Sequence, residues 1–128
     1  MPHSSPTGVR LPDVPTEPFG VFEVQQLTRS TALESIVAAD WVRIAAGKTS
    51  EIHRHNQAET ILWIVEGSGT VVVADTEFAV EPGARIAIGK GVYHGVRTSG
   101  QSLTFLSVQC PPILNHETGT LDLEPETA

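Results

Sequence analysis

The chain has 128 residues, a length that fits one domain with a single core and excludes a multidomain protein. Hydrophobic residues make up 40% and charged residues 18% of the chain, so it has enough apolar surface to fold and is not wholly disordered. Eight basic against fifteen acidic residues give a net charge of -7, which repels phosphate backbones and anionic lipids. We therefore expect neither a nucleic-acid partner nor a membrane partner.

Residues 1–18 are predicted to form a proline-rich flexible arm, because proline fixes φ and removes a backbone donor. The arm has no apolar run that resembles a signal peptide. No segment of the chain approaches the ~18 consecutive apolar residues that a membrane-spanning helix needs. The only cysteine, Cys110, cannot form an internal disulfide, so the fold needs no oxidising compartment. A cytoplasmic location is therefore expected.

Residues 19–116 are predicted to form a β-rich domain of many short strands, because β-branched and apolar runs alternate with turn signals such as the GSG at 67–69. Only residues 29–39 have the spacing of a helical turn, and part of that stretch also suits a strand. A closed or double-sheet antiparallel barrel hides the edges that so many strands would expose. The predicted strands are residues 20–27, 36–46, 60–66, 70–74, 77–80, 84–88, 92–98 and 102–109.

Residues 117–128 are predicted to form an acidic C-terminal tail, with four acidic side chains and no basic one. Leu121 and Leu123 can dock as a short edge strand. The last residues are expected to fray.

Two histidines, His53 and His55, flank Arg54. Alternate residues of a strand point to one face, so the two imidazoles can aim at one point while Arg54 faces away. Glu59 follows as an oxygen donor, and a barrel can bring His94 alongside from a later strand. Such a set suits one divalent transition metal (Fe, Mn, Zn, Ni, Co or Cu), with positions left open for water or substrate. The alternative is that the two histidines lie on the surface.

The spacing around these residues resembles the first motif of the cupin superfamily, which runs Gly, five residues, His-x-His, three or four residues, Glu, six residues, Gly. Residues 47–67 fit this motif with one extra residue before Gly67. Counting forward from the histidines gives Glu59 as the acid, with a β-bulge that absorbs the extra residue. Counting back from Gly67 gives Thr60, and Gln57 is a third candidate. We predict Glu59, because a threonine lacks the charge of a carboxylate.

The second cupin motif runs Gly, five residues, Pro-x-Gly, two residues, His, three residues, Asn. Residues 83–98 keep both outer glycines and His94, but Gly89 replaces the proline and Thr98 replaces the asparagine. The resemblance covers roughly residues 40–110 and implies an all-β, small jelly-roll barrel with little helix. It also implies that the metal lies inside one end of the barrel.

Strand parity suggests residues that line the pocket around the metal. Trp63, in phase with Glu59, either walls this pocket or packs in the interior or in a dimer interface. Arg43 either recognises an anionic group of the substrate or is exposed. Glu59 can serve as a base if it does not bind the metal. We therefore name Glu59, Trp63 and Arg43 as candidate catalytic residues. One face of the predicted strand at residues 102–109 mixes apolar and polar side chains and would suit a partly polar cavity, unless the register shifts by one step. The side chains on this face are Phe105, Ser107 and Gln109.

The resemblance implies a metal-dependent enzyme that acts on a small organic molecule, as a dioxygenase or as a non-redox isomerase, cyclase or lyase. The alternative is a non-catalytic module that binds or senses a small ligand, and the absence of a helix-turn-helix pattern speaks against a DNA-binding regulator. The resemblance further implies a homodimer. His3 and His116 lie in the flanking segments and are expected to be solvated, with no role as ligands.

Overall fold

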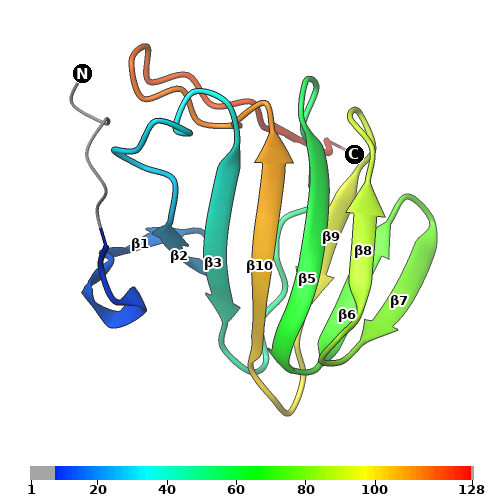
Figure 1. Cartoon of the computed structure of the whole chain (residues 1–128). Helices are drawn as coiled ribbons and strands as arrows, with labels where there is room; N and C mark the ends of the chain where they lie inside the picture. The colour runs from blue at the N-terminus through cyan, green and yellow to red at the C-terminus, as the bar shows by residue number, and fades with distance from the viewer. Residues whose placement is uncertain (1–7, 128) are drawn as a thin grey trace.

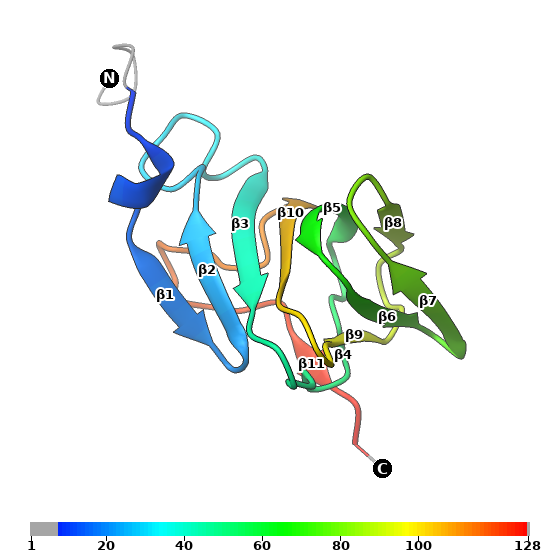
Figure 2. The same cartoon turned by 90° about the horizontal axis from the view of Figure 1, so that it is seen from below.

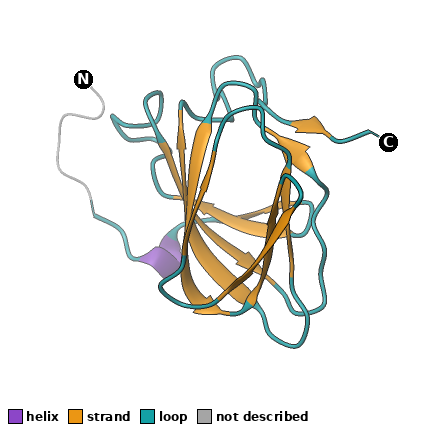
Figure 3. Cartoon of the chain, turned by 90° about the vertical axis from the view of Figure 1, so that its right-hand side faces the viewer, coloured by secondary structure: helices purple, strands orange, loops and turns teal. Residues whose placement is uncertain are grey.

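The computed structural model describes residues 8–127, and its regular structure is almost entirely β-strand. The strands form two antiparallel sheets that face each other (Figure 1 and Figure 3). One sheet has six strands in the order β1-β2-β3-β10-β5-β8, and the other has five in the order β11-β4-β9-β6-β7. The predicted all-β jelly-roll barrel with little helix is therefore confirmed.

The six-stranded sheet interleaves the two halves of the chain, since β10 lies between β3 and β5 (Figure 2). Its strands are β1 (Thr16–Phe19), β2 (Phe22–Gln26), β3 (Ala38–Ile44), β5 (Glu59–Gly67), β8 (Arg85–Ile88) and β10 (Leu103–Cys110). The strands of the second sheet are β4 (His53–Arg54), β6 (Gly69–Val73), β7 (Thr76–Val80), β9 (His94–Arg97) and β11 (Glu124–Pro125).

Both flanking segments supply strands to these sheets. β1 begins at Thr16, within the predicted arm, and pairs with β2. β11 lies within the predicted tail and pairs with β4. Within the described residues the only helix is the 3-10 turn η1 (Leu11–Asp13), and residues 29–37 form turns where a helical turn was predicted. No helix in the described part of the chain has the length and apolar character needed to cross a bilayer.

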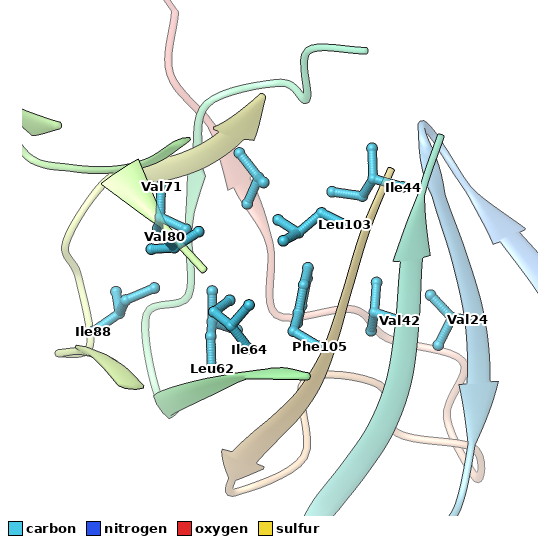
Figure 4. Packing of buried hydrophobic residues seen from close by; sticks show 11 residues of the cluster. Val24, Val42, Ile44, Leu62, Ile64, Val71, Val80, Ile88, Leu103 and Phe105 are labelled. Carbon is cyan, nitrogen blue, oxygen red and sulfur yellow. The ribbon is translucent and has the colours of Figure 1, made fainter. Parts of the chain in front are cut away.

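The inward face of the six-stranded sheet changes from apolar to polar along its strands. Ile44 pairs with Leu103, and in the next inward row Val42 pairs with Phe105. These side chains meet valines of the second sheet in the core, which Figure 4 shows. Toward the start of β3 the inward rows become polar: Asp40 pairs with Ser107, and Gln109 lies between Ala38 and Thr60. The fold thus fills one end with hydrocarbon, and at the other end the six-stranded sheet contributes a group of polar side chains.

Gly67 ends β5 at a point where two backbones nearly touch. Its φ is +83°, and an added Cβ would lie 1.9 Å from the carbonyl oxygen of Ser102. Gly83 also has a positive φ, +94°, but nothing lies within 4 Å of its added Cβ. We expect Gly67→Ala to lower the free energy of unfolding by at least ~3 kcal/mol. Gly83→Ala, which adds only backbone strain, should cost ~1–2 kcal/mol. Urea denaturation of both variants checks this, and equal losses would contradict it.

Candidate metal centre

Three histidines from two distant parts of the sequence converge at the polar end of the barrel. His53 lies in β4, His55 follows it, and His94 begins β9, where it is the register partner of His53. The ring centroids are 4.6 to 5.1 Å apart, and one nitrogen from each ring lies within 4.8 Å of the other two. All three side chains are buried. The alternation predicted for the first pair holds, because Arg54 points away to a salt bridge with Glu124 at 2.6 Å.

Each ring has one nitrogen tied to a backbone carbonyl. Nδ1 lies 3.0 Å from the Glu51 oxygen in His53 and 2.9 Å from the Val92 oxygen in His94. In His55 it lies 2.7 Å from the Asp122 oxygen. A carbonyl oxygen only accepts, so each Nδ1 carries the hydrogen and donates it. The lone pair for a metal is therefore on Nε2 of every ring.

The electrostatics favour the unprotonated rings that bind metals. Burial lowers the pKa of His94 to about 4, although its hydrogen bond to Val92 opposes the shift. Burial likewise lowers the pKa of His53. Both rings are thus neutral near neutral pH, and three imidazoles with fixed tautomers are a donor set that fits Zn, Fe, Co, Ni or Cu.

Glu59 does not lie with the histidines, contrary to the predicted ligand set. It is exposed, and its Oε2 accepts a hydrogen bond from the backbone N–H of Lys90 at 2.8 Å. Thr60 is buried and lines the cavity in its place. The expected bulge exists, but the register shift lies opposite Thr104 and Phe105, near the far end of β5. It therefore leaves the alternation at the start of β5 unchanged, with Glu59 outward.

The other predicted side chains also lie outside the cavity. Trp63 is 49% exposed on the outer face of β5. Arg43 is exposed and pairs with Glu23 at 3.0 Å, the alternative that the sequence left open. Gln57 is exposed on the loop after His55. Trp63 and Arg43 face outward because of strand parity. In each of their strands the residues of the opposite parity carry the apolar side chains, and those face the core.

The histidines open into a cavity of about 150 Å³ between the two sheets, lined mostly by apolar side chains. The predicted mixed face of β10 lies in it, with Phe105, Ser107 and Gln109 all buried. Gln109 donates from Nε2 to Ser107 Oγ at 2.8 Å. Within the described residues, Gln109 Oε1 and Thr60 Oγ1 are buried without a hydrogen-bond partner. Both atoms have almost no accessible surface, so a molecule in the cavity would reach them only after a rotation of the side chain.

Asp40 is a cavity residue that the sequence analysis did not single out. It lines the same cavity and lies between Ser107 and Gln26 in register. Burial, with a smaller contribution from the charge of Glu17, raises the pKa of its carboxyl to about 6. The sequence pattern does indicate that Asp40 faces inward, because Val42 has the same parity in the strand and is apolar. A carboxyl with such a pKa can accept or give a proton near neutral pH.

The two flanking histidines have different outcomes. His116 lines the cavity and its Nε2 lies 3.0 Å from Gln26 Oε1, so it is not simply solvated. It is not among the ring nitrogens that converge. His3 lies outside the described residues.

Comparisons with known proteins agree with this geometry. A family model for the cupin domain matches residues 40–109. A polyketide cyclase, RemF from Streptomyces resistomycificus, superposes with a TM-score of 0.74 at 25% identity over 83% of this chain and 80% of that one. A predicted oxalate decarboxylase from Thermotoga maritima gives 0.74 at 18% identity over 82% and 99%. A sugar phosphate isomerase from Silicibacter pomeroyi gives 0.69 at 19% identity over 84% and 77%. No curated protein matches the chain.

Proposed function

This chain belongs to the cupin domain family, and on that premise we propose that it is a metal-dependent enzyme that rearranges a small, largely apolar organic molecule without redox change. Cyclisation, isomerisation and lysis are the reactions in this class. The observation that carries the proposal is the set of three imidazoles that each bring a ring nitrogen within 4.8 Å of the other two and that line a cavity. We favour this class over the dioxygenase option because a second group suited to proton transfer, Asp40, lines the same cavity.

His53, His55 and His94 are the residues proposed to hold the ion. A divalent ion bound there would supply Lewis-acid polarisation of a substrate oxygen. Three protein ligands leave at least one coordination position open to that oxygen. Both the ligand set and the reaction depend on the rings staying unprotonated, which their burial favours.

The size and lining of the cavity support a substrate with a compact apolar part. An engineered apolar cavity of ~150 Å³ holds one benzene molecule, so the cavity here has room for about one ring. Its apolar lining would favour that ring by burial. Thr60 and Gln109 line the cavity and have polar atoms without a partner, so a rotation of either side chain would let it orient the ring through a hydrogen bond to a hydroxyl or carbonyl group.

Asp40 takes the acid–base role that the sequence analysis gave to Glu59. Its carboxyl lines the cavity, and no salt bridge engages it within residues 8–127. A carboxyl with a pKa of about 6 is mostly ionised at pH 7 but keeps a protonated minority, so it can both take up and return a proton. We assign it the step that removes a proton from a carbon or oxygen of the substrate and returns it at another position.

A metabolite experiment tests the proposed function. The purified protein is first analysed for bound metals and then incubated with small phenols and linear polyketide chains, with and without EDTA. The polyketides are included because of the similarity to a polyketide cyclase. We expect a product that forms equally without oxygen and is lost with EDTA. A product that gains oxygen atoms only in air would replace the proposal with a dioxygenase, and a ligand held but never converted would replace it with a binding module.

Two expectations stay predictions. The homodimer implied by the family resemblance is tested by sedimentation at several protein concentrations. The cytoplasmic location is tested by fractionation of cells that express the untagged chain.

A further inference from the structure

We propose that Asp122 is a positioning residue of the metal centre. It fixes the tautomer and the direction of the His55 ring, although it lies in a segment far away in the sequence. The role of Asp122 in metal binding rests on the proposed function. Its effect on the His55 ring does not, and that effect can be tested in metal-free protein.

His55 differs from the other two ligands in the origin of its carbonyl partner. His53 and His94 each bond to a carbonyl two residues earlier in their own segment. His55 bonds to the Asp122 carbonyl at 2.7 Å, across 67 positions of the sequence. The first two rings are therefore oriented by local backbone, whereas the third depends on how the C-terminal segment docks.

The carboxylate of Asp122 holds the loop that follows His55. Oδ1 accepts from the N–H of Asn56 at 2.7 Å, and Oδ2 accepts from those of Gln57 and Ala58 at 2.9 and 3.3 Å. Asp122 therefore binds the His55 ring through its backbone carbonyl and the loop after His55 through its carboxylate. Hydrogen bonds from backbone N–H groups to a carboxylate are stronger than neutral ones, so this attachment resists local opening.

The rest of the segment is anchored on both sides of Asp122. Its own N–H donates to the Ile113 carbonyl at 2.7 Å. Beyond it, β11 pairs with β4, so that Pro125 is the register partner of His53, and the N–H of Glu126 donates to the Ile52 carbonyl at 2.8 Å. Figure 2 shows β11 beside β4 and β9. The C-terminal segment thus runs along the strand that carries the ligands, with Asp122 at the ligand-bearing end.

Asp122→Ala removes the carboxylate and frees the loop, so the carbonyl no longer has a fixed position opposite Nδ1. The His55 ring can then adopt the other tautomer, with its lone pair on Nδ1. Loss of a group that orients a metal ligand typically weakens affinity ~10–100-fold, and we expect that loss for Zn²⁺. Asp122→Asn keeps one acceptor oxygen and should give an intermediate affinity. Glu126→Gln alters an acid of the same segment whose side chain makes none of these contacts, and serves as the matched control.

Two measurements test the inference on the full chain. The first is the ¹⁵N chemical shifts of the His55 ring in metal-free protein at about pH 8, where imidazoles are neutral. The second is the Zn²⁺ dissociation constant from competition with a chelator. We expect a single Nδ1–H tautomer in the wild type and in Glu126→Gln, a mixture in Asp122→Ala, and a smaller change in Asp122→Asn.

An unchanged tautomer in both Asp122 variants would overturn the inference, as would an unchanged Zn²⁺ affinity. If Asp122→Ala does not fold, Asp122→Asn decides alone. If the wild type fails to bind Zn²⁺, or any other divalent ion tried, the proposed function fails, but the ring shifts still decide whether Asp122 orients His55.

Discussion

Replacing His94 with alanine is expected to weaken metal binding by more than ~100-fold and to abolish turnover while the fold stays intact. The imidazoles of His53 and His55 would remain, and they can no longer enclose an ion with the partner from β9. The fold should survive because the His94 ring is not part of the apolar core. Elemental analysis, chelator competition and urea denaturation measure the three effects.

Glu59→Gln is the matched control for this variant. It removes the carboxylate that the motif count places beside the histidines but that the structure turns toward the Lys90 backbone. Metal content and affinity should stay as in the wild type. If His94→Ala kept its metal while Glu59→Gln lost it, the ligand set assigned here would be wrong.

The convergence of the histidines is predictable because its determinants are local. His53 and His55 share a face by strand alternation, and the order and spacing of two motifs indicate the barrel that brings His94 to them. The structure places the three rings together as this reasoning expects. What the motifs do not contain is the ring orientation, because one of the three carbonyl partners comes from Asp122, far outside the matched region.

The prediction of Glu59 as the acidic ligand fails for a reason that sequence spacing cannot resolve. One residue more or less between the histidines and β5 reverses the face of every following side chain. Counting from the histidines gives Glu59, and counting from Gly67 gives Thr60. The apolar parity of Leu62 and Ile64 favours Thr60, since those side chains must face the core. The same parity argument places Trp63 outside.

The C-terminal segment shows the limit of compositional reasoning. Four acids and no base, with two leucines that can dock, predict an acidic tail with a short edge strand, but they assign the acids no partners, whereas Asp122 and Glu124 are each engaged in the ligand-bearing segment. Such contacts span more than sixty positions, and no local pattern in a single sequence encodes them.

Asp40→Asn is expected to lower turnover by a factor of ~10²–10⁴ with unchanged metal content, because it removes the proton-transfer group and leaves the ligands intact. The substituted amide keeps nearly the same shape in the row between Gln26 and Ser107. A purely structural role would instead lower stability and activity together. Turnover of the substrate found in the metabolite experiment, measured beside metal content, separates the two. Full activity in Asp40→Asn would falsify the assigned role.

The same variant should become more stable relative to the wild type as pH rises. In the wild type, the unfolded Asp40 carboxyl loses its proton near its ordinary pKa of 3.8, whereas the folded one keeps it until about pH 6. The folded state therefore binds more protons between these values, and wild-type stability falls as pH increases through them. The difference in unfolding free energy, variant minus wild type, should grow by roughly 2 kcal/mol from pH 4 to pH 7, since each pKa unit corresponds to about 1.4 kcal/mol and the unfolded carboxyl is already partly ionised at pH 4. Because both proteins share the histidines, their contribution cancels in this difference. Urea denaturation across that range measures it, with Asp75→Asn as the control for the same change on the exposed turn between β6 and β7. A difference that stays flat with pH would mean that folding does not raise the pKa of the Asp40 carboxyl.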